Sequence, residues 1–459
     1  MNDQDTIAAV ATPMGLGGIG VIRVSGPGAH ARIDRLFRRS RRSGKPPSHL
    51  LCHGHIIDPD DGEPLDEVLV ALFKAPRSYT GEELAEIHCH GGPLVVRKIL
   101  GLILADAVRP AEPGEFTLRA FLNNRIDLAQ AEAVQDTICA MTERSLKNAQ
   151  AQLAGRLSEE IARLREPILE AVTFVEASID FPEEEIEGPA LSRILDDLDR
   201  VAGGVSELLK TYDEGRIYRD GATVVIAGRP NSGKSSLFNR ILRTERAIVT
   251  STPGTTRDMI EETVNIRGIP VKLVDTAGLR EGAGEVERIG MGMARKEAAE
   301  ADLILYMVDL SERIDEAEPA AIEELSDGPT IVALNKVDIA DPSSVDEGLR
   351  IFPEYGATPI SATRGDGIDQ LLNSISSIIT SSYEDVNSDV VISSARHRLA
   401  IEGALTSLKR ARRTLREGAP LELTAIDLRD CLDSLGLIVG ETTTEDILDL
   451  IFSRFCIGK

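Results

Sequence analysis

One short segment, GRPNSGKSS, carries residue types that bind phosphate groups at a fixed spacing. Gly228, Gly233, Lys234 and Ser235 fit the pattern G-x-x-x-x-G-K-[ST], after the strand-like run ATVVIA and before a helix-like run. Glycines let backbone amides wrap phosphate oxygens, a lysine reaches the β- and γ-phosphates, and a serine hydroxyl can bind Mg²⁺. The segment therefore predicts a nucleoside triphosphate site.

Three further segments follow in the order that a GTP site needs. Asp275 in DTAG ends the run VKLVD and can coordinate magnesium, while Gly278 is placed to sense the γ-phosphate. The carboxylate of Asp338 in NKVD can accept two hydrogen bonds from the N1 and exocyclic amine of guanine, a pair that adenine does not offer. The segment SAT, residues 361–363, can close the base pocket. Four segments in order favour GTP over ATP and disfavour an incidental glycine-rich turn.

The residue that follows DTAG is informative about hydrolysis. Leu279 stands where Ras-like enzymes carry a glutamine that orients the attacking water. The chain must therefore position water in another way, or hydrolyse GTP slowly by itself. Glu281, Glu285 and Glu287 are candidates, each with the alternative of a solvated loop charge.

The segment AIVTSTPGTTRD, residues 247–258, is the expected first switch, and Thr256 is the candidate ligand of magnesium and the γ-phosphate. Oxygens across residues 250–255 could also surround a monovalent cation, whose charge would replace an arginine finger. The predicted GTP-binding residues are Asn231, Ser232, Gly233, Lys234, Ser235, Ser236, Thr250, Ser251, Thr252, Pro253, Gly254, Thr255, Thr256, Asp275, Thr276, Ala277, Gly278, Asn335, Lys336, Asp338, Ser361, Ala362 and Thr363.

Length and composition limit what can surround this site. The chain has 459 residues, of which 42% are apolar, so about three domains with real cores are expected. No run approaches the roughly 18–20 apolar residues of a membrane span, and five scattered cysteines fit a reducing cytosol. The net charge of −24 argues against a broad nucleic-acid-binding surface, but not against a local basic patch or a basic partner.

The spacing of apolar and polar residues changes along the chain. Residues 1–123 mix turns with the β-rich runs Gly20–Ser25, Val68–Phe73 and Leu84–His88. Helical spacing then dominates to about Tyr212, and Pro167 should kink or divide it. From Ala222 to about Ser382, strand-like and helical runs alternate, which predicts a parallel sheet with crossover helices. Residues 386–459 are helical again.

These changes predict a multidomain fold class, α/β and all-α. An N-terminal α+β domain spans residues 1–123, and a discontinuous helical domain combines residues 124–216 and 386–459. A P-loop GTPase domain, residues 217–385, is inserted into the helical domain.

Strings spread along the whole chain resemble the MnmE (TrmE) family of tRNA-modification GTPases. They include GRPNSGKSSLFN, TPGTTRD, DTAGLR with EVERIG, and the C-terminal FCIGK. GGIGVIRVSG, SYTGEELAEIHCHGGP, PGEFTLRAFLNNRIDLAQAEAV and IDFPEEEI add to it. Related GTPases share the GTPase motifs, whereas FCIGK and the N-terminal strings are far more specific.

The resemblance implies a mechanism and partners. The N-terminal domain would be similar to folate-binding domains and would form a homodimer, and the Ras-like G domains would meet when GTP and potassium bind, which activates hydrolysis. With the flavoprotein MnmG, which carries FAD, the family modifies carbon 5 of the wobble uridine of certain tRNAs with a carboxymethylaminomethyl-type group. A tetrahydrofolate derivative (5-formyl or methylene) supplies the one-carbon unit. A cytoplasmic location is expected.

The resemblance also assigns roles to single residues. Ser235 and Thr256 match the magnesium ligands, and Glu287 matches the acidic residue that orients the attacking water through a bridging water. The potassium ligands would be Asn231, Thr250, Thr252 and Thr255. The folate pocket would take Arg23, Glu86, Arg125 and Lys459. Arg125 replaces the family's frequent lysine, which keeps the charge but changes the geometry.

The candidate catalytic residues are Lys234, Glu287 and Cys456 in FCIGK. For the thiol of Cys456, a structural or pocket-lining role is the alternative.

Weaker patterns have plainer explanations. Cys52, His53, His55, His88, Cys89 and His90 invite a metal site, but their spacing fits no zinc pattern, and strand alternation places His88 and His90 opposite Cys89. The basic islands Arg35–Lys45 and Lys409–Arg416 are solvated faces or contacts with tRNA or the partner.

Two other functions remain open from the sequence. A ribosome-assembly switch similar to Era or EngA shares the GTTRD-type loop, but Era-like proteins carry a basic RNA-binding module and EngA-like proteins two GTPase domains. Folate chemistry uncoupled from GTP is the third hypothesis.

Overall fold

The computed structural model describes residues 5–40, 47–105, 107–181, 188–245, 261–275, 298–315, 317–325, 328–381 and 390–459. The chain divides into two compact units. The first unit comprises residues 1–135, 153–161 and 432–459, and the second comprises residues 136–152 and 162–431. The domain boundaries predicted above remain predictions.

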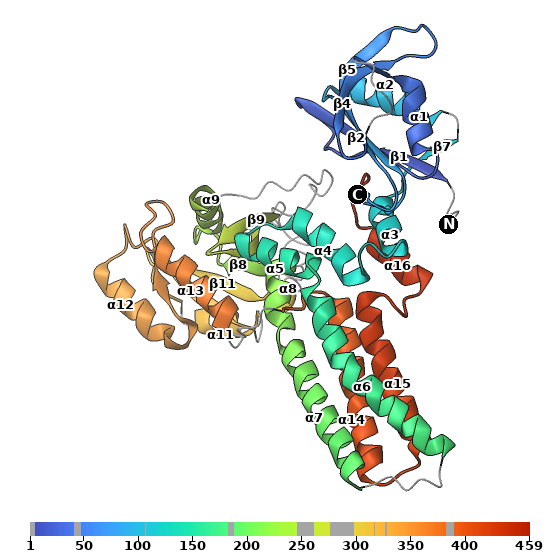
Figure 1. Ribbon diagram of the computed structural model, residues 1–459. Coiled ribbons are helices and arrows are strands. Elements are labelled where there is room, and N and C mark those ends of the chain that lie inside the picture. The colour runs from blue at the N-terminus through green and yellow to red at the C-terminus, as the bar shows by residue number, and fades with distance from the viewer. Residues whose placement is uncertain are drawn as a thin grey trace, which may run out of the picture. The chain divides into compact units, whose positions relative to one another are not determined.

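The first unit is built on a seven-stranded sheet in the order β3-β4-β5-β6-β2-β1-β7 (Figure 1). All neighbouring strands are antiparallel except β1 and β7, which are parallel. The strands are β1 (Thr6–Val10), β2 (Ile19–Ser25), β3 (Phe37–Arg39), β4 (Leu51–Ile57), β5 (Pro64–Phe73), β6 (Leu84–His90) and β7 (Val108–Pro110). The three predicted β-rich runs are therefore confirmed as β2, β5 and β6.

Strand alternation gives this sheet two different faces. Ile22, Val24 and Ile87 belong to a buried cluster that also contains residues of α1 (Ala29–Leu36) and α2 (Pro93–Leu104). Arg23 and Glu86, which pair across β2 and β6, alternate with these buried residues. The sheet thus separates an apolar layer on one face from a polar row on the other. The same alternation buries Cys89 and leaves His88 and His90 on the other face, as predicted.

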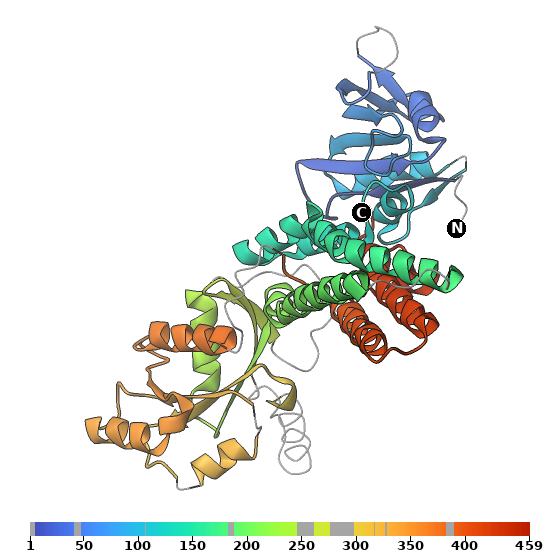
Figure 2. The same ribbon diagram turned by 60° about the horizontal axis from the view of Figure 1, so that its bottom comes forward.

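The helices in residues 115–220 and 395–452 are α3 (Glu115–Leu122), α4 (Leu128–Cys139), α5 (Glu143–Leu153), α6 (Arg156–Asp180), α7 (Gly188–Lys210), α8 (Tyr212–Asp220), α14 (Ala395–Arg416), α15 (Leu421–Val439) and α16 (Glu445–Phe452). Figures 1 and 2 show α6, α7, α14 and α15 side by side. Ion pairs join α14 to α7 through Arg416 and Asp199, and α15 to α6 through Arg429 and Glu176.

Pro167, which was predicted to kink or divide the helical stretch, does not divide it. α6 continues from Arg156 to Asp180 with Pro167 inside it, and the helix boundaries fall at residues 140–142 and 154–155 instead. Packing of the apolar positions Ile161, Leu164 and Ile168, all buried, outweighs the backbone hydrogen bond that a proline cannot make.

The second unit contains a six-stranded sheet in the order β13-β12-β11-β8-β10-β9. The strands are β8 (Ala222–Gly228), β9 (Glu261–Ile266), β10 (Ile269–Asp275), β11 (Leu303–Asp309), β12 (Thr330–Asn335) and β13 (Thr358–Pro359). The helices are α9 (Lys234–Thr244), α11 (Glu318–Glu323), α12 (Pro342–Ile351) and α13 (Ile368–Ser381), with a 3₁₀ turn at Pro353–Tyr355.

This sheet is parallel except at one edge. The parallel pairs are those of β8 with β10 and β11, and of β12 with β11 and β13. β9 pairs antiparallel with β10, a strand that the expectation of a purely parallel sheet did not include. Arg267 and Gly268 connect the two strands, and both have positive φ values, as a tight hairpin turn requires. In parallel sheets ligands bind beyond the carboxyl ends of the strands, where the predicted GTP segments begin.

None of the helices that the structure describes is both long and apolar enough to cross a membrane.

Candidate functional site

The phosphate loop lies between β8 and α9 and requires glycine at two positions. Gly228 and Gly233 have φ values of +138° and +100°, in a region that L-residues avoid. A Cβ atom at Gly233 would lie 2.3 Å from Nδ2 of Asn335, and one at Gly228 would lie 2.5 Å from the carbonyl oxygen of Met307. The loop therefore passes against two neighbouring strands, and α9 begins at Lys234 directly after it.

The charged and hydroxyl side chains of this loop meet at the ends of β8 and β10. Nζ of Lys234 donates to the carbonyl oxygens of Gly228, at 3.0 Å, and Arg229, at 2.7 Å. The Ser235 hydroxyl donates to Oδ2 of Asp275 at 2.9 Å. A hydroxyl and a buried carboxylate in contact offer the hard oxygen ligands that Mg²⁺ prefers, so the residues present fit a magnesium ion between them.

The base-recognition segments are fastened to the phosphate loop by Asn335. Its Nδ2 donates to the carbonyl oxygen of Ser232 at 2.7 Å, and its Oδ1 accepts the backbone N–H of Ala362 at 3.0 Å. One buried amide thus connects the phosphate loop, NKVD and SAT. A hydrogen bond with Ser361 lowers the pKa of Asp338, so this carboxylate is ionised at neutral pH and can accept the two donors of guanine.

The remaining predicted nucleotide residues divide into two groups. Asn231 lies on the phosphate loop with φ of +63°, Lys336 pairs with Asp309, and Ser236 is exposed on the first turn of α9. Outside the described residues lie Thr250, Ser251, Thr252, Pro253, Gly254, Thr255, Thr256, Thr276, Ala277, Gly278 and Glu287.

A second polar site lies in the first unit and joins residues from three distant parts of the chain. Nε and Nη2 of Arg23 lie 3.0 and 2.8 Å from Oε1 of Glu86, and Nη1 donates to the carbonyl oxygen of Gly458 at 3.4 Å. The guanidinium also lies over the rings of Tyr79 and Phe116, 5.1 and 5.7 Å from their centroids. Arg23 is thus engaged by its own chain and holds Glu86 in place.

Arg23 pairs with a carboxylate in this site, whereas no described hydrogen bond or ion pair joins Lys459 to one. Lys459 is half-buried, and burial, followed by the nearby charge of Arg23, lowers its pKa. The structure therefore brings together Arg23, Glu86 and Lys459, three of the four predicted folate residues. Arg125 is exposed on the turn after α3, and no described hydrogen bond or ion pair joins it to these three.

The C-terminal segment FCIGK is held inside the first unit by its backbone. Gly114 donates its N–H to the carbonyl oxygen of Cys456 at 3.4 Å, and Pro113 and Ile457 form an antiparallel bridge. Gly458 has φ of +94°, and a Cβ atom there would lie 2.3 Å from the carbonyl oxygen of Val10. These contacts bring Lys459 to Arg23 and leave the side chain of Cys456 exposed.

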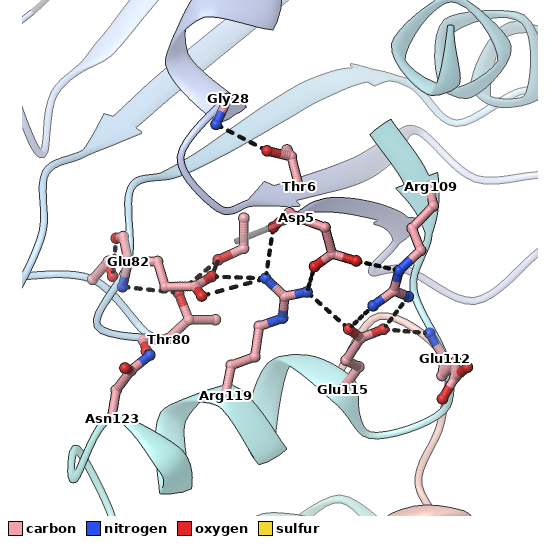
Figure 3. Close-up of polar contacts among 12 residues, drawn as sticks. Asp5, Thr6, Gly28, Thr80, Glu82, Arg109, Glu112, Glu115, Arg119 and Asn123 are labelled. Carbon is pink, nitrogen blue, oxygen red and sulfur yellow. Dashed lines mark hydrogen bonds and ion pairs between the residues drawn. The ribbon is translucent and has the colours of Figure 1, made fainter. Parts of the chain in front are cut away.

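A network of five charged residues, missed by the sequence reasoning, ties α3 to β7 and to the residues before β1 and β6 (Figure 3). Arg119 binds Asp5, Glu82 and Glu115, and Arg109 binds Asp5 and Glu115. Glu115 is only 1% exposed. Burial acts to raise the pKa values of Asp5 and Glu115, but the arginine hydrogen bonds outweigh it, and both lie below their ordinary values. The available signal was the acid–base pair Glu115 and Arg119, four residues apart on a helix whose other residues, apart from Thr117, are apolar.

The second basic island is largely neutralised by carboxylates of its own unit. Arg410 pairs with Asp427 and Asp430, and both Arg412 and Arg416 pair with Asp199. These pairs support the interpretation as a solvated face. Of the first island, residues 41–45 lie outside the described residues.

Three of the four histidines in the disfavoured metal pattern lie beside single carboxylates: His53 beside Glu67, His88 beside Glu86 and His90 beside Asp66. Among the described residues, no group of three or more His, Cys, Asp or Glu side chains could hold a metal ion.

Known proteins match this chain in both units. The family model of the GTP-binding protein TrmE N-terminus matches residues 6–125, and that of the MnmE helical domain matches residues 128–456. The tRNA modification GTPase MnmE of Carboxydothermus hydrogenoformans is 46% identical, over 99% of this chain and 100% of that one. The protein of the same name from Geotalea uraniireducens is 47% identical over 99% of both chains. Aquifex aeolicus Era bound to GDP and AlF4⁻ is 26% identical over 40% of this chain and 66% of that one, with a TM-score of 0.29.

Proposed function

The chain belongs to the MnmE family of tRNA modification GTPases, and on this premise we propose that it is a potassium-activated GTPase that helps to modify the wobble uridine of certain tRNAs. A flavoprotein partner, MnmG, would supply FAD, and a tetrahydrofolate derivative would supply the one-carbon unit added at carbon 5. The protein would act in the cytoplasm as a homodimer whose G domains meet to hydrolyse GTP.

The observation that carries the folate part of this proposal is the convergence of Arg23, Glu86 and Lys459. Arg23 occupies Oε1 of Glu86 at 2.8 Å, and Nε2 of His88 lies 3.7 Å from Oε2, beyond hydrogen-bond distance. Oε2 would therefore accept the hydrogen bonds from the amino-amide edge of a pterin. Lys459 can bind the carboxylates of the glutamate tail. A tetrahydrofolate derivative, when bound, supplies the one-carbon group.

The hydrolytic step would use the residues of the phosphate loop. Lys234 leaves the carbonyls of residues 228 and 229 to neutralise charge on the β- and γ-phosphates as the γ-phosphoryl group passes to water. Magnesium, when bound to Ser235 and Thr256, screens the same charge. Potassium, when bound at Asn231, supplies the positive charge that an arginine finger supplies in other GTPases. Glu287 would orient the attacking water.

The first experiment measures GTP turnover by the purified full-length chain in potassium chloride and in sodium chloride at equal ionic strength. Potassium should stimulate the rate strongly, and Asn231→Ala should remove the stimulation while leaving the slow basal rate. Equal slow rates in the two salts would contradict the cation mechanism and favour a switch that a partner activates.

A second experiment separates the folate site from the GTP site. In a reaction with the flavoprotein, tRNA and a methylene-tetrahydrofolate, Lys459→Ala should abolish modification and weaken folate binding but keep potassium-stimulated hydrolysis. Lys98→Ala, at an exposed lysine of α2, is the matched control. If Lys459→Ala binds folate as well as the control does, the proposed folate pocket is wrong.

Modification of tRNA also distinguishes the proposal from a ribosome-assembly switch. Tight ribosome binding, together with normal wobble uridine in cells that lack the protein, would favour the switch.

A further inference from the structure

Arg229 is the second residue of the phosphate loop, and two carboxylates bind its guanidinium. Nε lies 2.9 Å from Oε1 of Glu318 at the start of α11, and Nη2 donates to Asp315. The positive charge of this side chain is therefore matched by carboxylates of the same unit. Of the two described cations, Arg229 and Lys234, Lys234 is therefore the one that can bind the phosphates.

Glu318 is itself fixed in position. It is 4% exposed, and its second oxygen, Oε2, accepts the hydroxyl of Tyr306 at 2.5 Å. Tyr306 lies on β11 and is buried. Burial, together with the hydrogen bond to Glu318, raises the pKa of Tyr306, so the phenol remains a donor at neutral pH. Both oxygens of Glu318 are thus bound, one by the sheet and one by the phosphate loop.

The backbone of Arg229 connects this pair to the lysine that binds phosphate. Its carbonyl oxygen accepts Nζ of Lys234 at 2.7 Å and the N–H of Ser232 at 3.3 Å. The residue before it, Gly228, packs against the backbone of Met307 on β11. A shift of Arg229 would therefore move the carbonyl that holds Lys234 and the turn that carries the phosphate-binding amides.

The segment that carries Asp315 and Glu318 also contacts the base-recognition end of the site. At its beginning Asp309 pairs with Lys336 of NKVD, and Leu310 donates its N–H to the carbonyl oxygen of Asn335 at 3.0 Å. Residues 309–318 therefore contact the base end of the GTP site through Asp309 and the phosphate end through Glu318.

We propose that Arg229 and Glu318 are positioning residues for nucleotide binding, a pair that holds the phosphate loop and its backbone amides in the geometry that receives the β- and γ-phosphates. Because the loop contacts these phosphates in the ground state and in the transition state alike, loss of the pair weakens binding uniformly. Uniform loss raises KM and leaves kcat unchanged.

The test compares Arg229→Ala, Arg229→Lys, Glu318→Gln and the double variant Arg229→Ala/Glu318→Gln in the full-length chain. GTP hydrolysis gives kcat and KM, binding of a fluorescent GDP gives Kd, and thermal unfolding gives Tm. Arg313→Ala, at an exposed arginine of the same segment, is the matched control.

Arg229→Ala should raise KM for GTP and Kd for GDP about 10-fold, as expected for a half-exposed, charge-assisted pair, and keep kcat within about twofold. Arg229→Lys should restore part of the affinity, because lysine keeps the charge but not the fork of donors. Glu318→Gln should have a smaller effect of the same kind. The double variant should be no weaker than Arg229→Ala, since residues that act as a unit are not additive.

Three results would overturn the proposal. A lower kcat at unchanged KM, with a lower Tm, would show a purely structural role, because such variants lose active molecules rather than affinity. An equal rise of KM in Arg313→Ala would show a general effect of charge. Additive effects in the double variant would show that the two residues act separately.

Discussion

The nucleotide site of the second unit and the charged site of the first unit are assembled in different ways. In the nucleotide site, polar side chains bind mainly to the backbone: Lys234 to two carbonyls, and Asn335 to the carbonyl of Ser232 and the N–H of Ala362. In the first unit, charged side chains bind one another, as Arg119 binds Asp5 and Glu115. A backbone site can lose one side chain and keep its shape, whereas a buried network that loses one charge leaves the opposite charges unpaired.

Replacement of Lys234 by alanine is the largest change that this comparison predicts. The Lys234→Ala variant should lose roughly 10²–10³-fold in kcat for GTP, the usual cost of removing one group that stabilises transition-state charge. It should keep its fold, because the carbonyls of residues 228 and 229 are neutral and can be hydrated. Steady-state hydrolysis and thermal unfolding measure the two effects, with Lys409→Ala, an exposed lysine of α14, as control. Activity within threefold of the control would show that the loop binds phosphate without this cation.

Arg119→Ala tests the opposite behaviour in the first unit. The side chain of Arg119 is 9% exposed, and its loss leaves Glu115 and Asp5 without one partner. We expect the free energy of unfolding to fall by about 3 kcal/mol, at the low end for a broken buried pair, in urea denaturation. Arg125→Ala, on the exposed turn after the same helix, should change it by less than about 0.5 kcal/mol. Similar small changes in both variants would mean that the network of Figure 3 adds little stability.

The same network predicts how stability depends on pH. The pKa values of Asp5 and Glu115 are lower in the folded chain than their ordinary values of 3.8 and 4.5. Their contribution is therefore present above those ordinary values and is lost as the pH falls through the depressed, folded values. Urea denaturation between pH 6 and pH 3 should show a steeper acid loss for the wild type than for Arg119→Ala. Parallel curves would contradict the assignment.

Asp338→Asn changes specificity within the backbone-built site, and its effect should be intermediate. An amide presents a donor where guanine needs an acceptor, so affinity for GTP should fall by about 10- to 100-fold, as for other bidentate base contacts. Xanthosine triphosphate, which offers a carbonyl in place of the exocyclic amine, should bind better to the variant than to the wild type. Competition with fluorescent GDP measures both affinities. An unchanged preference for GTP would place base recognition elsewhere.

Cysteine labelling probes the burial of side chains in both units and has the smallest expected effect. Cys139 and Cys456 are exposed, whereas Cys52, Cys89 and Cys431 are buried. Burial raises the pKa of Cys89 to about 11 and that of Cys431 to about 12, so these two thiols are also protonated at neutral pH and react slowly. In native protein, mass spectrometry should find maleimide on Cys139 and Cys456 only, and Cys456→Ser should remove one of the two labels. Rapid labelling of Cys89 would show that the sheet of the first unit opens readily.

The sequence predicted the regular strands and helices better than the places where the fold departs from a regular pattern. β2, β5 and β6 follow the predicted alternation, and β8, β10, β11 and β12 follow the expected parallel pattern. The antiparallel edge strand β9 was missed, although the Arg267–Gly268 turn could have indicated it. Pro167 was predicted to kink or divide α6, yet the helix is not divided, because burial of neighbouring apolar residues decided its continuity.

The sequence alone was enough to locate the phosphate loop, Asp275, NKVD and SAT, because each is a short segment whose chemistry depends on its own backbone and on the strand before it. The charged site of the first unit was a different case. The resemblance named Arg23, Glu86 and Lys459, but only the tertiary structure showed that Arg23 holds Glu86 and that the end of the chain reaches both. The network of Asp5, Glu82, Arg109, Glu115 and Arg119 also required the fold. Its members lie up to 114 positions apart, and pairing over such separations is decided by sheet register and helix packing, which no local spacing records.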